Sequence, residues 1–540
     1  MSDVHGDAGG DTRRHVSSVE ATTVAEILAA QATERPDDVF LYFADRTVTF
    51  AELNREVNRV ANGLARLGVT TGAGVAIMMG NSPEWLYLYF ATQKRGAYAV
   101  PVTVALRGEG LRYVIDHSDS LVVVCDPERA PWVLAVADGT PHVRHSVVDT
   151  TEAPPEWQVP AGWLTLAEVT DASAEEPSAL IDPDAIAAIM YTSGTTGAPK
   201  GVVSRYRRTS IAGIRMLAGM LAPDEVQYTC LPLFHANALM LTTLRGLVVG
   251  RPVVLARRFS ASGFWDEIRR YGVTTFNGLG AMMPILIKQP ERPDDADNPV
   301  RTVFSAACPA SVWEQFEKRF GVHIIEGYAA VDGGGFMIIN FGQSPKGSIG
   351  APTNPIRIVD EDGNDVPVGA PGELLFKVDD PEARRVEYYK NSDASDGRIR
   401  DGWLYTGDLV TADEGGNLYF VDRKTDSLRR RGENISSWEV EREINRHPAV
   451  LESAVFGVPS ELGEDDVMAI VVPKEGHTVT PEEIVAHCEG LMAGFMVPRW
   501  VEIRAALPKT ETHRVQKAEL KAAGVGPATW DREAQGRSAK

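Results

Sequence analysis

The sequence predicts an α/β protein with a large N-terminal domain of mixed and parallel sheets and a small, mobile α+β C-terminal domain. Short apolar strands alternate with helical segments through most of the chain before residue 421, and this alternation is typical of largely parallel sheets. The composition changes near residues 422–426, and a compact α+β pattern follows. A chain of 540 residues is also too long for one ordinary domain.

These observations divide the chain into a disordered tail at 1–20, a large domain at 20–421, a hinge at 422–426, a small domain at 427–530 and a second tail at 531–540. The first tail is polar and lacks an apolar core, so it does not have the pattern of a signal peptide. Within the large domain, residues 151–179 are rich in Pro, Glu and Ala. We expect that stretch to be a surface connection.

The large domain opens with helical and hairpin patterns. Apolar spacing predicts helices at Val24–Ala32 and Ala51–Leu67, with a hairpin between them. A further helix begins after Ser82, which suits the cap position, while Pro83 suits the first turn. Buried strands are predicted at Val75–Met79, Leu121–Val124, Ala185–Met190, Val253–Leu255 and Thr274–Phe276.

The small domain shows alternating helix and strand patterns. Ser436 and Ser437 precede a helix through Glu439 to Arg446. Strands follow at Glu452–Gly457 and Val467–Val472. Thr480 and Glu483 then form a capping box that opens a helix.

Charge and cysteine content exclude several classes of function. A net charge of −20 and a pI of about 5.1 argue against nucleic acid or an anionic membrane as the main partner. The four cysteines are scattered and suggest neither a disulfide framework nor a metal cluster, so we expect a reducing cytoplasm. We also expect no membrane span, because the chain has no run of about 18 apolar residues.

A glycine- and threonine-rich loop follows the strand that ends at Met190. Glycines allow a ligand to approach the backbone closely, and hydroxyls with a lysine suit phosphate oxygens. The loop lacks the Gly-Lys-Ser/Thr of a Walker loop, and an ordinary flexible linker is the alternative. Its candidate nucleotide-binding residues are Thr192, Ser193, Gly194, Thr195, Thr196, Gly197 and Lys200.

The whole string through Pro199-Lys200-Gly201 resembles the signature loop of the adenylate-forming superfamily, which comprises acyl-CoA synthetases, nonribosomal adenylation domains and luciferases. The resemblance to acyl-CoA synthetases covers nearly the whole chain, with the motifs in family order. It implies that a carboxylate attacks ATP to form acyl-AMP, that the small domain rotates, and that the CoA thiol then attacks the acyl-AMP. It also implies ATP or the AMP moiety of acyl-adenylate, CoA, and Mg²⁺ where adenylation occurs.

Further motifs resemble the family's adenine and ribose contacts. Ser305 to Pro309 lies where the family lines the adenine site with small residues, here Ala306, Ala307 and Cys308. Gly327 and Tyr328 supply an aromatic face for adenine. Asp408, in Tyr-Thr-Gly-Asp, matches the carboxylate that accepts both ribose hydroxyls, and Arg423 matches a second ribose contact. A surface turn carboxylate is the alternative for Asp408.

The acyl and CoA sites are implied in the same way. His235, in Leu-Pro-Leu-Phe-His-Ala, matches a residue that gates the acyl pocket, with a core histidine as the alternative. Ala329, Gly333 and Gly334 are candidate pocket residues; they suggest a bulky hydrophobic acid, unless the glycines simply form a turn. The loop expected to line the pantetheine tunnel contains Arg430, Arg431, Gly432 and Glu433, with a solvated basic patch as the alternative.

Three positions depart from the family pattern where adenylation occurs. Arg514 stands at the family's lysine, and its planar fork is a poor substitute for a point ammonium. Lys517 could replace that lysine only if the loop slipped by three residues. Val331 stands at a phosphate-binding threonine and cannot donate a hydrogen bond. Asp332 stands at the Mg²⁺-holding glutamate and reaches less far. The hinge position is Thr425, where the family has Asp or Lys.

The departures predict an enzyme that forms a thioester from acyl-adenylate and CoA, with ATP-dependent adenylation weak or absent. A separate adenylating ligase would then supply the acyl-adenylate. The alternatives are a full two-step ATP-dependent carboxylic acid–CoA ligase, acyl transfer to a carrier protein, and a non-catalytic acid-binding relative. We expect a monomer or homodimer.

Overall fold

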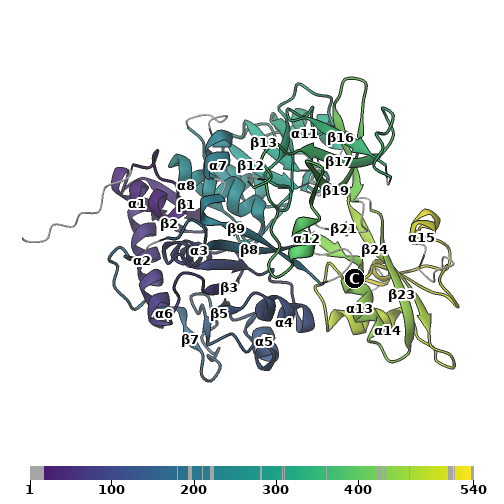
Figure 1. Ribbon diagram of the computed structural model, residues 1–540, viewed down its shortest axis with the longest axis horizontal. Helices are drawn as coiled ribbons and strands as arrows, with labels where there is room; N and C mark the ends of the chain where they lie inside the picture. Colours follow the sequence, from purple (N-terminus) through teal and green to yellow (C-terminus); the bar gives the residue numbers. More distant parts are fainter. Residues whose placement is uncertain are drawn as a thin grey trace, which may run out of the picture.

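The computed structural model describes residues 17–178, 181–192, 198–208, 211–218, 224–279, 282–306, 308, 310–360, 362–382, 384–423, 427–430, 433–460, 463–508, 515 and 517–536. It confirms the predicted fold class: a large N-terminal domain contains three sheets with flanking helices, and a smaller α+β domain follows. Figure 1 shows the small domain in yellow-green at one end of the molecule, beside α4.

The first sheet of the large domain carries the glycine-rich loop. Its strand order is β7-β6-β5-β3-β4-β8-β9, and all pairings are parallel except β8 with β9. Every residue of β3 is buried, as expected for a parallel strand covered on both faces. The strands are β3 (Gly74–Met78), β4 (Tyr98–Pro101), β5 (Ser120–Cys125), β6 (His145–Val148), β7 (Leu164–Thr165), β8 (Ile186–Thr192) and β9 (Lys200–Arg205).

The second sheet has eight strands in the order β15-β14-β13-β12-β10-β11-β1-β2. Its inner pairings are parallel, while β2 and β15 join antiparallel at the two edges. The strands are β1 (Val39–Phe43), β2 (Arg46–Thr49), β10 (Gln227–Thr229), β11 (Val253–Leu255), β12 (Thr275–Leu279), β13 (Thr302–Ala306), β14 (His323–Ala329) and β15 (Met337–Asn340).

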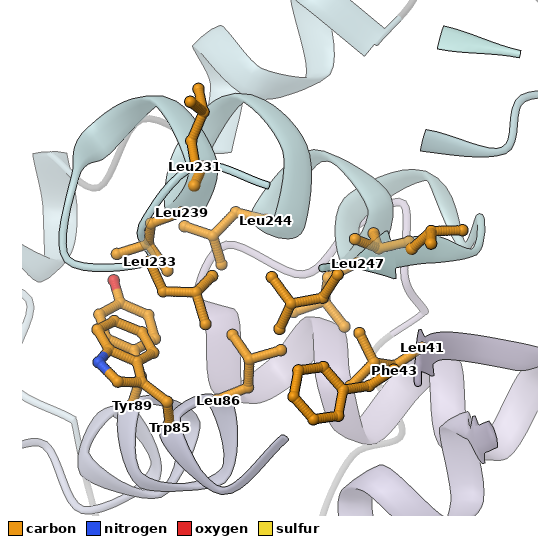
Figure 2. Packing of buried hydrophobic residues seen from close by; sticks show 14 of the residues in the cluster. Leu41, Phe43, Trp85, Leu86, Tyr89, Leu231, Leu233, Leu239, Leu244 and Leu247 are labelled. Carbon is orange, nitrogen blue, oxygen red and sulfur yellow. The ribbon is translucent and has the colours of Figure 1, made fainter. Parts of the chain in front are cut away.

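Helix α3 (Pro83–Lys94) lies in the main core of the large domain, and every one of its residues is buried. Ser82 caps it and Pro83 occupies its first turn, as predicted. Figure 2 shows Trp85, Leu86 and Tyr89 of this helix facing leucines of the segment 231–247, with Leu41 and Phe43 of β1 beside them. Burial of each such side chain contributes roughly 1.5–3 kcal/mol, so this cluster fixes α3 and that segment together.

A third sheet was not distinguished by the sequence patterns and is antiparallel throughout. Strands β16-β17-β19-β18 form its main path, and β20 pairs with β19. It supplies the ribose motif to the candidate site. The strands are β16 (Ile356–Val359), β17 (Gly372–Lys377), β18 (Ile399–Arg400), β19 (Trp403–Ala412) and β20 (Leu418–Arg423).

The remaining helices of the large domain cover these sheets. The predicted helices at 24–32 and 51–67 are present, each with a capping box. A π-helix, η3, follows the predicted acyl-gate motif. The elements are α1 (Val24–Glu34), α2 (Phe50–Arg66), α4 (Gly108–His117), α5 (Ala130–Val136), η1 (Ala137–Gly139), α6 (Leu166–Thr170), η2 (Tyr206–Arg208), α7 (Ile211–Ala218), η3 (Asn237–Leu244), α8 (Arg245–Val249), α9 (Phe264–Arg270), α10 (Met282–Ile287), α11 (Ala310–Phe320) and α12 (Ser392–Asp396).

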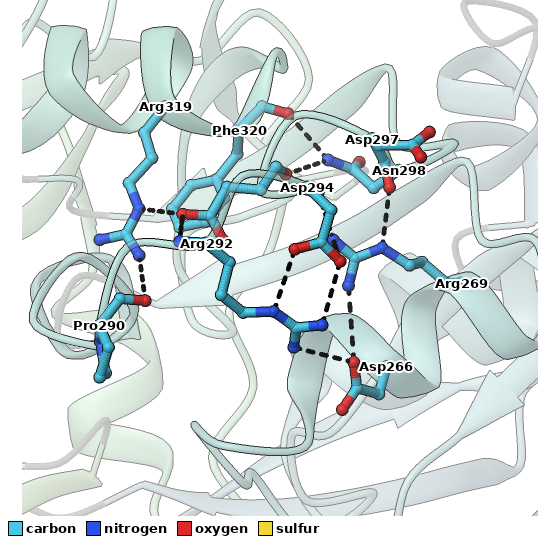
Figure 3. A network of polar contacts seen from close by, with 10 residues as sticks. Asp266, Arg269, Pro290, Arg292, Asp294, Asp297, Asn298, Arg319 and Phe320 are labelled. Carbon is cyan, nitrogen blue, oxygen red and sulfur yellow. Dashed lines mark hydrogen bonds and ion pairs between the residues drawn. The ribbon is translucent and has the colours of Figure 1, made fainter.

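A polar network holds the loop between α10 and β13 (Figure 3). Arg292 pairs with Asp294 and Asp266, and Arg269 donates to the Asp294 and Asp297 carbonyls. Arg319 of α11 donates to the Ile287 and Pro290 carbonyls and to Asp295. The network fixes the approach to β13, whose last residues border the candidate site.

The stretch 151–179 is more structured than the predicted surface connection. It contains β7 and α6, and α2 binds its far end: Asn62 donates to the Ser173 and Glu175 carbonyls. Buried Lys94 pairs there with Glu176 and donates to Asn58 Oδ1 at 2.8 Å.

The small domain has its own two apolar clusters, built from residues 428–530. Its C-terminal boundary differs from the prediction, because residues 530–536 form β26 and α16 and Asp531 pairs with Arg499. Ser18 likewise donates to Glu34, so the first tail ends earlier than predicted. The elements are β21 (Ser427–Arg430), β22 (Glu433–Ser436), α13 (Ser437–Asn445), β23 (Val450–Pro459), β24 (Asp465–Pro473), α14 (Pro481–Glu489), β25 (Trp500–Ile503), α15 (Lys517–Ala523), β26 (Trp530–Asp531) and α16 (Arg532–Gly536).

The small domain meets the large domain along α4. Ala105 packs against the small domain's core. A Cβ built at Gly110 of α4 would lie 3.1 Å from Oε1 of Glu439 in α13. In the part of the chain that the structure describes, no helix combines the length and the apolarity needed to cross a membrane.

Candidate functional site

The glycine-rich loop joins two antiparallel strands. Thr192, the last residue of β8, pairs with Lys200, the first of β9, and its Oγ1 lies 3.4 Å from the Lys200 carbonyl oxygen. The Lys200 ammonium lies 5.2 Å from the centroid of the Tyr388 ring. Residues Ser193, Gly194, Thr195, Thr196 and Gly197 lie outside the described residues. The structure thus fixes both ends of the predicted phosphate loop at one sheet edge.

The predicted adenine residues come together at the ends of two parallel strands. Ser305 of β13 pairs with Glu326 of β14, which sets Ala306 beside Gly327. The backbone N–H of Cys308 donates to Oε2 of buried Glu326 at 3.1 Å. A Cβ at Gly327 would meet its nearest neighbour at 3.9 Å, so the strand is open at that point. Ala307 lies outside the described residues.

The aromatic and the carboxylate of the predicted nucleotide site contact each other directly. The Tyr328 hydroxyl donates to Asp408 Oδ2 at 2.6 Å. Asp408 is 2% exposed, which argues against its alternative as a surface turn carboxylate. Its backbone pairs across β19 and β20 with that of Arg423, the second predicted ribose contact. One strand pair therefore holds both predicted ribose residues next to the predicted adenine ring.

The turn that leads to Asp408 is itself fixed by hydrogen bonds. Thr406 Oγ1 donates to the Leu374 carbonyl at 2.7 Å and accepts from the Asp408 N–H at 3.1 Å. Gly407 has a φ of 75°, a conformation that favours glycine. Its N–H donates to Glu373 Oε1 at 3.0 Å. The ribose motif is therefore preorganised by hydrogen bonds within β19 and to the neighbouring strand β17.

Asp332, the predicted metal-holding carboxylate, is already bound by two side chains. The Tyr388 hydroxyl donates to Asp332 Oδ2 at 2.7 Å, and the Arg398 guanidinium lies 3.5 Å from the same oxygen. Neighbouring Val331 is 41% exposed and offers no donor. Among the described residues, no group of three or more His, Cys, Asp or Glu side chains could hold a metal ion.

The Mg²⁺ that the resemblance implies does not fit this arrangement. Mg²⁺ takes oxygen ligands in near-ideal octahedral geometry and is usually bound through one or two carboxylates together with waters and substrate phosphates. To bind Asp332, the Mg²⁺ ion would have to displace the Tyr388 hydroxyl and lie next to the Arg398 guanidinium, which is also positively charged. These contacts argue against the predicted role of Asp332 as a metal ligand, because Arg398 already places a positive charge beside its carboxylate.

Sequence reasoning missed Tyr388 and Arg398. Tyr388 lies beside the first sheet, where it forms a bridge with Val202 of β9, and Arg398 directly precedes β18 of the third sheet. The backbone N–H of Tyr405 donates to the Arg398 carbonyl at 2.9 Å. That antiparallel contact brings Arg398 to the ribose motif, and it could be found only by recognising the pairing of these strands.

His235 lies at the domain boundary rather than in the core. Its Nε2 lies 2.7 Å from Oε2 of Glu433, the first residue of β22. The segment before it is held by buried Asn81, which donates to the Leu231 and Ala256 carbonyls and accepts from the Leu233 N–H. The structure thus joins a predicted acyl-site residue to a predicted CoA-site residue across the two domains.

The other predicted CoA residues separate into two groups. Arg430 is 3% exposed and is used within the small domain, where it pairs with Asp466 at 3.0 Å and donates to the Val497 carbonyl at 3.1 Å. We therefore assign Arg430 a structural role in place of the predicted CoA contact. Arg431 and Gly432 lie outside the described residues.

The glycines predicted to line an acyl pocket form a turn between β14 and β15. Gly334 and Gly335 have φ of 61° and 76°, and a Cβ at Gly334 would meet the Arg384 carbonyl at 3.0 Å. The backbone conformation of Gly334 therefore favours the alternative that the glycines form a turn. Ala329, at the end of β14, is exposed beside them.

The remaining predicted positions concern the hinge and the C-terminal loop. Arg514 and the hinge residue Thr425 lie outside the described residues. Lys517, the unfavoured substitute for the family lysine, has its Nζ 2.6 Å from Glu441 Oε1 and donates to Ser437 Oγ at 2.8 Å. It is thus held by α13 within the small domain.

Comparison with known proteins places this geometry among nucleotide-dependent enzymes. The AMP-binding enzyme family matches residues 28–379, and the AMP-binding enzyme C-terminal domain matches residues 439–514.

Individual relatives match almost end to end. A medium/long-chain-fatty-acid–CoA ligase of Mycobacterium marinum is 33% identical over 499 residues, covering 91% of this chain and 95% of that protein. A crotonobetaine/carnitine–CoA ligase of Salmonella paratyphi C is 30% identical over 488 residues, covering 88% and 93%. The crystal structure of an anthranilate CoA ligase in complex with anthranoyl-AMP matches with a TM-score of 0.69 and 26% identity, covering 94% of this chain and 99% of that one.

Proposed function

Because this chain belongs to the AMP-binding enzyme family and its relatives are acyl-CoA ligases, we propose that it converts a carboxylic acid, through its acyl-adenylate, into the acyl-CoA thioester. The observation that carries the proposal is the contact between His235 and Glu433. It sets the hairpin of the small domain on the predicted acyl site, beside a preorganised nucleotide site.

The residues have distinct roles in this proposal. The Tyr328 ring stacks on adenine, while its hydroxyl holds Asp408, whose carboxylate accepts the ribose hydroxyls. Thr192 and Lys200 bound the glycine-rich segment whose residue types suit phosphate oxygens. Glu433 and His235 border the path by which the CoA thiol reaches the acyl carbonyl. Attack by sulfur forms the C–S bond and releases AMP.

The relatives favour the complete ATP-dependent reaction in two steps, which is the first candidate. The relatives' substrates, as named, are crotonobetaine or carnitine, medium- or long-chain fatty acids and anthranilate. They share a carboxylate but not a size or polarity. We therefore propose the class of substrate as a carboxylic acid and keep the predicted preference for a bulky hydrophobic acid as a question for a substrate panel.

A restriction to thioester formation is the second candidate, and it rests on the adenylation residues. Val331 offers no donor where the family has a threonine, and Asp332 is bound by Tyr388 and Arg398. Losing one preorganised donor costs on the order of 3 kcal/mol at a transition state. Thioester formation starts from an already activated carbonyl and needs fewer of these groups, so a separate ligase could supply the adenylate.

A split assay distinguishes the candidates. One arm supplies ATP, Mg²⁺ and a panel of free acids and follows pyrophosphate; the other supplies preformed acyl-AMP and CoA and follows thioester. Pyrophosphate and thioester together support the two-step ligase. Thioester without pyrophosphate supports the restricted enzyme. No thioester in either arm contradicts the proposed function and would favour carrier-protein transfer or a non-catalytic role.

The cellular compartment and the oligomeric state are also proposed. The four cysteines are buried and widely separated in the sequence, which supports the proposal of a reducing cytoplasm. We propose a monomer or homodimer, to be measured by light scattering.

A further inference from the structure

Arg398 occupies the place beside Asp332 where the resemblance implies a metal ion. Its Nη2 donates to the Asp332 carbonyl oxygen at 2.7 Å and lies 3.5 Å from the carboxylate Oδ2. Its Nη1 donates to the Thr406 carbonyl at 3.3 Å. The guanidinium therefore bridges the segment after the predicted adenine ring and the start of the ribose motif.

The position of Arg398 brings its charge close to the bound nucleotide. Asp332 follows Val331, the position at which the family's threonine meets the α-phosphate. On the other side, a Cβ built at Gly407 would have Nη1 of Arg398 as its nearest neighbour, at 3.9 Å, and Gly407 precedes Asp408. The fixed positive charge thus lies between the predicted phosphate and ribose contacts.

Hydrogen bonds hold the Arg398 guanidinium in place, but its neighbours neutralise its positive charge only in part. The side chains of Arg398 and Asp332 are 17% and 18% exposed. The Nε of Arg398 is buried, with no hydrogen-bond partner among the described residues. Arg398 contacts two carbonyl oxygens and one carboxylate, that of Asp332, which also accepts a hydrogen bond from Tyr388. The guanidinium can therefore still attract a further anion.

We propose that Arg398 supplies beside Asp332 the positive charge that the resemblance assigns to Mg²⁺, so that the AMP moiety binds without a metal at this carboxylate. This inference rests on the proposed function, because it names how the nucleotide of that reaction is held. Arg398 contacts the nucleotide phosphate, and Asp332 acts as the residue that positions Arg398. Metal carried by the phosphates of ATP is a separate matter and is unaffected by this role.

The test is calorimetric titration of the full chain with AMP, in EDTA and in millimolar Mg²⁺. We expect the wild-type Kd to be the same in both buffers. Arg398→Gln should weaken AMP binding about tenfold, because it removes a charge-assisted contact, and Arg398→Lys should recover part of the loss. Mn²⁺ titration followed by EPR in the presence of AMP should show a site gained in Arg398→Gln and lost again on adding Asp332→Asn.

Arg400→Gln is the matched control. Arg400 is two residues away and exposed, donates to the Gly397 carbonyl at 2.9 Å and lies over the Tyr405 ring. Thermal unfolding of each variant reports whether it folds. Mg²⁺-dependent AMP binding by the wild type, or unchanged binding by folded Arg398→Gln, overturns the role of Arg398 while leaving the thioester assay positive. Absence of AMP binding in both buffers overturns the proposed function as well.

Discussion

Nε2 of His235 and Oε2 of Glu433 lie 2.7 Å apart, and they come from different domains. This contact fixes the β21–β22 hairpin against the segment that Asn81 holds in place. Neither partner is fully buried, so this contact could separate in the rotation of the small domain that the family resemblance implies.

We expect Glu433→Gln to slow thioester formation and to leave pyrophosphate release unchanged. Hydrogen bonds to charged groups contribute about 1.5–3 kcal/mol, so the rate from preformed acyl-AMP and CoA should fall at least tenfold. Rapid-quench measurement of both half-reactions checks this. Equal loss in both half-reactions would mean that the pair supports the large domain's own site instead.

Asp408→Asn should weaken AMP binding more than Tyr328→Phe does. The first removes the charged acceptor for both ribose hydroxyls, while the second keeps the stacking ring and loses only the 2.6 Å hydrogen bond. We expect losses of about 10–100-fold and about fivefold, respectively. Fluorescence or calorimetric titration measures them, and the reverse order would argue against the ribose assignment.

Arg514→Lys, combined with Val331→Thr, should raise pyrophosphate release if the adenylation half-reaction is limited by these positions. An oxyanion-type donor typically changes the rate by 10²–10³-fold, and the lysine restores the point charge. Pyrophosphate exchange measures the gain. Brisk exchange by the wild type, with no gain in the variant, would show that the departures are tolerated.

Asn81→Ala should lower both stability and activity. It leaves the Leu231 and Ala256 carbonyls and the Leu233 N–H buried without the partner they now have, a cost on the order of 3 kcal/mol. Denaturant unfolding measures the loss. Asn62→Ala is the control, because Asn62 also binds two carbonyls but near the surface, and its effect should be clearly smaller.

Glu176→Gln should destabilise the chain in a manner that depends on pH. Burial lowers the pKa of Lys94 from its ordinary value of 10.5, and Glu176 opposes that shift. Without Glu176, the folded-state pKa falls further. Between that pKa and 10.5 the unfolded chain binds more protons, so stability should rise with pH across this window.

Thermal unfolding between pH 6 and about 10 measures this slope relative to the wild type. Lys94→Met is the comparison, because it removes the titrating group and should abolish the added slope. An identical slope in Glu176→Gln and the wild type would contradict the coupling.

The sequence predicted the fold class and the strands that begin and end in strongly apolar runs, because these follow local periodicity. Strand β3 and the capped helix α3 are examples. The third sheet was missed, since its pairings join segments with weaker local patterns. For the same reason, Arg398 was missed although it stands only ten residues before Asp408 in the printed sequence.

Residue types predicted which residues belong to the candidate site better than they predicted which groups those residues contact. Tyr328 and Asp408 were assigned to one nucleotide, and they prove to contact each other. Arg430 was assigned to CoA because it belongs to a run of arginines, yet Asp466 and backbone carbonyls bind it inside the small domain. Charge alone does not tell a structural arginine from a binding one, since burial decides and depends on distant strands.

Gly110 of α4 lies close to Glu439 of α13, so a larger residue at position 110 would contact the small domain. A methyl group there would lie 3.1 Å from Glu439 Oε1 and 3.4 Å from Leu106 Cδ2, so in Gly110→Ala the Glu439 side chain would have to shift slightly, at a point away from the residues of the candidate site. If the two half-reactions of the proposed function use different positions of the small domain, this variant would change their relative rates without altering a residue of the candidate site.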